Sequence, residues 1–119
     1  MKLIGFLVTA GVLLTITVAS ADRYDDLLVQ GVVLLKDGKP DRAEAVLQQA
    51  AAEKKDAAEP YYYLGIAYFS LGDMQKATAA LLKAIGNEPS NPAYHLQLAS
   101  TYRSAGDYDN ALKQYDETI

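Results

Sequence analysis

The chain has 119 residues, of which 50% are apolar and 22% are charged, a composition typical of one globular domain and not of a disordered segment. It contains no cysteine, which excludes a disulfide framework and a thiolate metal site. The formal net charge is −4, and the sequence has no basic stripe that could neutralise phosphate groups, so we do not expect nucleic acid as a partner.

The first 21 residues differ from the rest of the chain. Lys2 is followed by an uncharged and mainly apolar stretch, which ends in Ala19-Ser20-Ala21 before Asp22. A positive start, an apolar run and small residues at the end are the features of a secretory signal peptide. We therefore expect residues 1–21 to be a signal peptide cleaved after Ala21, which would make the protein periplasmic or secreted.

An uncleaved membrane anchor is the alternative for this segment. Residues 3–21 provide roughly the 20 positions that a helix needs to cross a bilayer. Against this, glycines and threonines dilute the apolar run, and the small residues at its end have no role in an anchor. A lipid anchor is excluded, because it would need a cysteine at the cleavage point.

From Tyr24 onward the sequence predicts helices joined by short turns, and no strand. Apolar residues recur three and four positions apart, as on one face of a helix. Glycines in the turns can adopt the left-handed conformation that ends a helix, and the aspartates Asp73 and Asp107 can cap the next helix. The expected helices cover residues 25–36, 40–54, 60–71, 74–87, 92–105 and 108–119.

A period of 34 residues runs through this part of the chain. Three sets of small residues share it, namely Gly31, Gly65 and Ala99, then Gly38, Gly72 and Gly106, and finally Ala43, Ala77 and Ala111. A fixed period of this length is typical of stacked helical units. It predicts units over residues 24–57, 58–91 and 92–119, the last of them incomplete.

The glycines within helices predict how each helix pair packs. Glycine inside a helix costs about 0.5–1 kcal/mol relative to alanine, so Gly65 should serve a close approach between helices. We expect it to lie against Ala77 of the following helix, with Leu81 filling the remaining space. The corresponding residues of the first unit are Gly31, Ala43 and Leu47.

The second unit carries a dense set of signature residues, namely Tyr61, Leu64, Gly65, Tyr68, Gly72, Ala77, Leu81, Ala84 and Pro89. At this spacing they resemble the tetratricopeptide repeat (TPR). The third unit follows closely, whereas the first has Gln30, Leu34 and Lys55 where leucine, tyrosine and proline are usual. The resemblance covers residues 24–119 and implies an all-α fold, a right-handed superhelical array of helix-turn-helix repeats.

The resemblance also implies a binding surface, because the first helices of such repeats line a concave groove. The residues that would contact a ligand are Leu28, Val32, Leu35, Tyr62, Ile66, Phe69, Leu96, Ser100 and Arg103. We call this set the first-helix stripe. It is mainly apolar and aromatic, which suits an amphipathic helix or an apolar extended segment of a partner protein, and Arg103 could hold a carboxylate.

Two alternatives concern the stripe. Its apolar residues could instead pack between neighbouring first helices, above all Leu28, Val32 and Leu35. Some TPR modules hold a C-terminal carboxylate with lysine and asparagine in the groove. We do not expect this binding mode here, because apolar residues such as Tyr62 and Ile66 occupy the required positions.

No motif for catalysis, metal binding or phosphate binding is present, so we expect neither an enzyme nor a cofactor. The three consecutive tyrosines Tyr61, Tyr62 and Tyr63 spread around a helix and cannot form one stacking platform. The single histidine, His95, stands where the repeat usually has a large packing aromatic.

The sequence therefore favours an exported scaffold that holds an apolar segment of a partner protein. One alternative is the non-catalytic part of a longer enzyme or assembly factor. Another is a self-assembling structural subunit that associates through its C-terminal helix, where the face with Leu112, Tyr115 and Ile119 has no cover.

Overall fold

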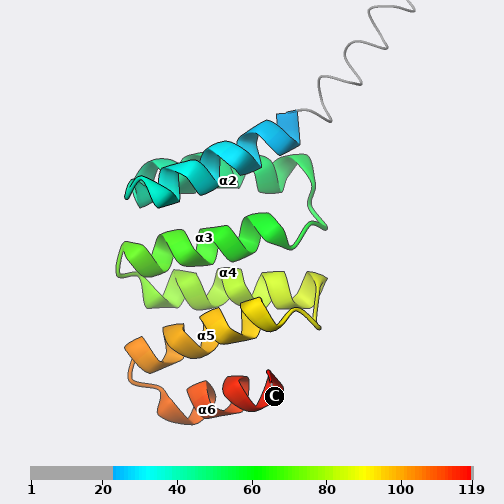
Figure 1. The fold of residues 1–119 in the computed structure, drawn as a ribbon. Helices are drawn as coiled ribbons and strands as arrows, with labels where there is room; N and C mark the ends of the chain where they lie inside the picture. Colours follow the sequence, from blue (N-terminus) through cyan, green and yellow to red (C-terminus); the bar gives the residue numbers. More distant parts are fainter. Residues whose placement is uncertain (1–22, 119) are drawn as a thin grey trace, which may run out of the picture.

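The computed structural model describes residues 23–118, which form helices joined by short turns (Figure 1). Residues 23–36 are helical, and α2 (Pro40–Glu53), α3 (Glu59–Ser70), α4 (Met74–Asn87), α5 (Pro92–Ser104) and α6 (Tyr108–Glu117) follow. These limits agree within two residues with the expected helices, so the predicted all-α fold of paired helices is confirmed. The expected signal peptide or anchor, residues 1–21, lies outside the described residues.

The helices stack in the order in which they occur in the sequence (Figure 1). Helix α3 packs against α2 on one side and against α4 on the other, and α4 packs in turn against α5. The first helices α3 and α5 also contact each other directly, whereas α2 and α4 lie on either side of α3 without contact between them. Between residues 23 and 118, no helix is long and apolar enough to span a bilayer.

The turns are built by the residues expected to build them. Gly38, Gly72 and Gly106 have φ angles of 71°, 82° and 83°, the left-handed conformation that glycine adopts without a steric penalty. The carboxylate of Asp73 accepts a hydrogen bond from the backbone N–H of Lys76 at 3.0 Å. Asp107 caps α6 in the same way. The two helices of each pair are therefore joined by a very short turn.

Small residues and leucines fill the interfaces, and the leucines expected to fill the space beside the helix glycines are nearer to them than the expected alanines. A Cβ atom added at Gly65 would lie 2.6 Å from Cγ of Leu81, and one added at Gly31 would collide with Leu47. The nearest side chains are thus leucines and not the alanines Ala77 and Ala43. The physical reason is that long side chains in a helix lean toward its N-terminus, so each leucine covers the position opposite the glycine.

The core runs through the stack as a line of fully buried side chains. Leu47, Leu81 and Leu98 have no exposed surface, and neither do the alanines Ala43 and Ala77. In each of the first two helix pairs, an alanine and a leucine at equivalent positions of the second helix are fully buried, namely Ala43 with Leu47 and Ala77 with Leu81. The spacing of 34 residues therefore corresponds to one packing arrangement used repeatedly.

Candidate protein-interaction surfaces

The first-helix stripe lies at the surface and is largely half-buried. The half-buried members are Leu28, Val32, Leu35, Tyr62, Ile66, Phe69 and Ser100, and the exposed members are Leu96 and Arg103. Half-burial leaves apolar area open to a ligand, and it also means that part of each side chain already packs within the protein. The individual contacts differ among the three helices.

In residues 23–36, two members of the stripe contribute to the core. Leu28 and Leu35 pack against the buried cluster that contains Leu47 and Leu64. Part of the surface of these two side chains is therefore buried by packing between helices, as the alternative interpretation expects. Val32 lines a surface pocket, and Leu28 contributes to the lining of the same pocket.

This pocket has a volume of about 270 Å³ and lies at the end of the stripe nearest the N-terminus. Its apolar lining includes Val32, Tyr63 and the strongly exposed Val29 and Val33. The sequence prediction did not include the last three residues. They extend the apolar surface beyond the predicted row.

In α3, Tyr62 is already engaged by other aromatic rings. Its ring centroid lies 4.9 Å from that of Tyr94 in α5 and 5.1 Å from that of Tyr63. Burial raises the pKa of the Tyr62 hydroxyl, with a smaller contribution from Tyr63. Tyr62 therefore joins two first helices, and a substitution there would disturb the fold as well as the surface.

In α5, the stripe is more accessible. Leu96 is 47% exposed, and Arg103 lies exposed in the last turn of the helix, where a positive charge interacts favourably with the helix dipole. His95, next to Leu96, does not act as an apolar packing residue. One ring nitrogen lies 2.9 Å from Oε1 of Gln114 and so joins α5 to α6. The other lies 2.8 Å from the carbonyl oxygen of Pro89 in the turn before α5.

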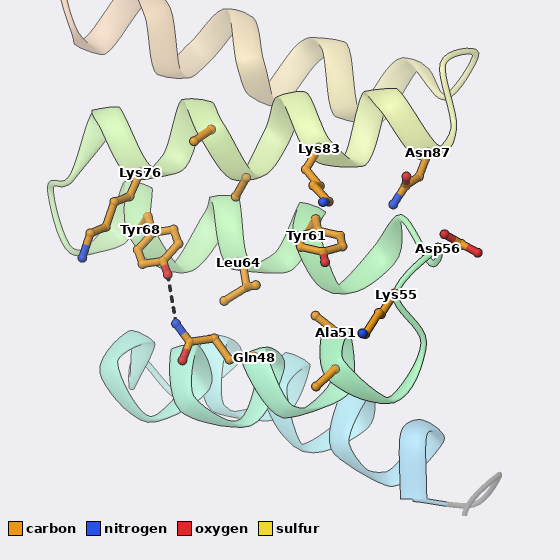
Figure 2. Close-up of a pocket in the computed structure, with 13 residues that line it drawn as sticks. Gln48, Ala51, Lys55, Asp56, Tyr61, Leu64, Tyr68, Lys76, Lys83 and Asn87 are labelled. Carbon is orange, nitrogen blue, oxygen red and sulfur yellow. Dashed lines mark hydrogen bonds between the residues drawn. The ribbon is translucent and has the colours of Figure 1, made fainter.

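A larger pocket, absent from the sequence prediction, lies between α2 and α4. Its volume is about 730 Å³, and side chains of α3 form its floor (Figure 2). We call it the α2–α4 groove. Tyr61, Leu64 and Tyr68 of α3 line it, and this side of α3 differs from the side that carries the stripe.

The groove combines an apolar floor with a basic rim. Ala51, Leu64 and Ala80 are buried and form part of its lining. The ammonium group of Lys76 lies 5.7 Å from the centre of the Tyr68 ring, and that of Lys83 lies 5.4 Å from the Tyr61 ring. The rim also includes Lys55 and Asp56 in the turn between α2 and α3.

The sequence contains a signal for this groove, but it is weak. Lys76 and Lys83 are seven residues apart in a helix, so they lie on the same side, with alanines between them. The repeat signature assigns Tyr61 and Tyr68 to packing. The space itself arises because α2 and α4 stand apart on either side of α3, which the pattern within one repeat does not specify.

The described part of the chain, residues 23–118, contains no cluster of three or more histidine, aspartate or glutamate residues that could hold a metal ion. The hydroxyl of Tyr94 donates a hydrogen bond to Glu88 at 3.0 Å, and burial raises the pKa of this hydroxyl. This hydrogen bond joins α5 to the end of α4 and does not assemble a reactive group.

Comparisons with known proteins agree with this architecture. A family model described as tetratricopeptide repeat matches residues 28–92, and a second with the same description matches residues 94–119. The chain is 33% identical over 115 residues to the tetratricopeptide repeat and J domain-containing co-chaperone DNJ1 of Fusarium oxysporum f. sp. lycopersici. That match covers 92% of this chain and 21% of the co-chaperone, so the chain spans about a fifth of that relative.

Two solved structures share the fold. A crystal structure of MamA is 30% identical with a TM-score of 0.79, and the match covers 88% of this chain and 61% of that chain. The second TPR of Spaghetti (RPAP3), bound to the HSP90 peptide SRMEEVD, is 17% identical with a TM-score of 0.78, covering 84% and 94% of the two chains. The chain therefore belongs to the tetratricopeptide repeat family, whose helical repeats form protein-interaction scaffolds and are typically non-catalytic.

Proposed function

We propose that the protein is an exported scaffold that holds an apolar segment of a partner protein on the first-helix stripe. The observation that carries the proposal is the row of partly exposed apolar side chains on the first helices of successive repeats. Exposed apolar surface of this kind normally marks an interaction site. Arg103 lies at one end of the row, where it can pair with a carboxylate of the same segment.

The chemistry of the stripe limits the kind of partner. Val32, Ile66 and Phe69 offer apolar surface and no charge, so a segment rich in carboxylates would leave its charges unpaired along most of the row. An amphipathic helix or an extended apolar segment can bury its own apolar side chains there. The RPAP3 repeat domain, whose structure contains the bound peptide SRMEEVD, is a precedent for peptide binding by this fold, although that peptide is acidic and not apolar.

Substitution of Leu96 tests the proposal with little risk to the fold, because this side chain is 47% exposed. Leu96→Asp places a charge in the stripe and should abolish capture of the partner. The matched control is Leu82→Asp in α4, since Leu82 is 49% exposed and belongs neither to the stripe nor to the lining of the α2–α4 groove. Circular dichroism should show the same helicity for both variants.

The partner is identified by a photo-crosslinking amino acid placed at Phe69 or Leu96 in the native host. The same crosslinked protein should appear from both positions and should be missing when the crosslinker replaces Lys113 in α6. Equal crosslinking from Lys113, or normal capture by Leu96→Asp, would contradict the proposal. Export is tested separately, because a mature chain that starts at Asp22 supports signal cleavage and an intact Met1 in the membrane fraction supports the anchor.

A self-associating structural subunit is the second candidate function. It is favoured by α6, where Tyr108 and Leu112 are 65% and 63% exposed. Sedimentation equilibrium should then reveal oligomers that Leu112→Asp dissociates. A strict monomer at all concentrations would eliminate this candidate.

A further inference from the structure

We propose that the α2–α4 groove is a second binding site, and that it takes an acidic segment of a partner protein in which apolar side chains lie between two carboxylates. The groove lies on a different side of α3 from the first-helix stripe. The proposal therefore does not depend on the function proposed for the stripe. It rests on charge, spacing and the nature of the floor.

The charge of the groove is opposite to that of the chain. Lys55, Lys76 and Lys83 line it with one carboxylate, that of Asp56, whereas the whole chain has a net charge of −4. Among residues 23–118, none of these lysines forms a salt bridge, and the ion pair present joins Arg23 to Glu53. All three lysines are exposed residues, and the ammonium groups of Lys76 and Lys83 contact tyrosine rings and no carboxylate in the described part of the chain.

The spacing of the lysines determines the kind of ligand. Lys76 and Lys83 are separated by seven residues of α4, which corresponds to about 10 Å along the helix axis. Their ammonium groups lie over different rings, those of Tyr68 and Tyr61, so a single small anion does not contact both in this arrangement. A segment in the polyproline II conformation can, because it rises by about 3.1 Å per residue with three residues per turn, so carboxylates three residues apart lie on the same side at nearly the same separation.

The floor between the lysines suits the intervening side chains. Leu64 and Ala80 provide apolar surface, and the rings of Tyr61 and Tyr68 stand on either side (Figure 2). Gln48 donates a hydrogen bond to the Tyr68 hydroxyl at 3.2 Å and thus helps to hold this ring in place. The volume of about 730 Å³ lies within the range of about 300–1,000 Å³ that is typical of ligand pockets.

The test uses a fluorescent peptide with two glutamates three residues apart and a phenylalanine and a leucine between them. Fluorescence anisotropy should show binding to the wild-type chain at low salt and weaker binding at high salt. The Lys76→Gln/Lys83→Gln variant should bind the peptide at least fivefold more weakly. The matched control Lys39→Gln/Lys113→Gln removes the same charge outside the groove and should change the affinity less than twofold.

Several results would overturn the proposal. These are no binding to the wild-type chain at millimolar peptide, equal binding of a peptide with glutamines in place of the glutamates, and unchanged affinity of the Lys76→Gln/Lys83→Gln variant. Self-association that this variant abolishes would assign the groove to a second copy of the chain instead. Leu96→Asp should leave peptide binding intact, so failure at the stripe and failure at the groove are distinguishable.

Discussion

The contact between Gly65 and Leu81 leads to a quantitative prediction for Gly65→Ala. The added methyl group would lie 2.6 Å from Cγ and 2.8 Å from Cδ2 of Leu81, whereas carbon atoms in contact are normally about 3.5–4.0 Å apart. Leu81 has no exposed surface, so it cannot turn toward solvent to relieve the overlap. Overpacking of this kind typically costs about 1–3 kcal/mol.

Alanine also stabilises a helix relative to glycine, by about 0.5–1 kcal/mol, and this gain offsets part of the loss. We therefore expect Gly65→Ala to lower the free energy of unfolding by about 1–2 kcal/mol. In a domain of this size each kcal/mol lowers Tm by about 4–8 °C. Urea unfolding and thermal melting followed by circular dichroism measure both quantities.

Gly86 provides the matched control, because it also lies in a helix but has open space where a Cβ atom would stand. Gly86→Ala should raise the free energy of unfolding by about 0.5–1 kcal/mol. A second test adds Gly65→Ala to a Leu81→Ala background, where the obstacle is gone and no further loss is expected. A Tm for Gly65→Ala equal to or above that of the wild type would refute the packing argument.

Two further predictions concern pH and helix capping. The pKa of His95 is raised because its charged ring donates hydrogen bonds to the carbonyl oxygen of Pro89 and to Gln114. Protonated His95 therefore stabilises the folded state fully below the unfolded pKa of about 6.5, and this stabilisation is lost as the pH rises through the folded pKa. Urea unfolding at several pH values should show this dependence for the wild type and not for His95→Ala, and identical profiles would contradict it. Asp73→Ala and Asp107→Ala each remove a helix cap and should lower the free energy of unfolding by about 1 kcal/mol in the same assay. An unchanged free energy of unfolding in both variants would contradict this prediction.

The fold could be predicted almost completely from the sequence, because short-range chemistry determines it. Gly72 ends one helix with a positive φ angle and Asp73 starts the next, and both effects depend only on residues nearby in the chain. The period of 34 residues then relates one turn to the next. Errors arise where side chains from different helices meet, as at Gly65, whose neighbour is Leu81 and not Ala77.

The candidate surfaces could be predicted only in part. Periodicity places Tyr62, Phe69 and Leu96 on one row, but it does not reveal that Tyr62 already stacks on Tyr94 from the neighbouring first helix. The α2–α4 groove was missed for a related reason. Its shape depends on how far apart two second helices stand, which is a property of the stack and not of any single repeat.

The order of helix contacts has a consequence for folding. The labelled helices contact their neighbours in sequence, and the longest-range contact, between α3 and α5, skips only one helix. Such local contacts give a low contact order, which favours rapid folding that can nucleate in any repeat. Helices α3, α4 and α5 each pack against labelled helices on both sides, so their amide protons should exchange more slowly with solvent than those of α6, and unfolding should begin at the ends of the stack.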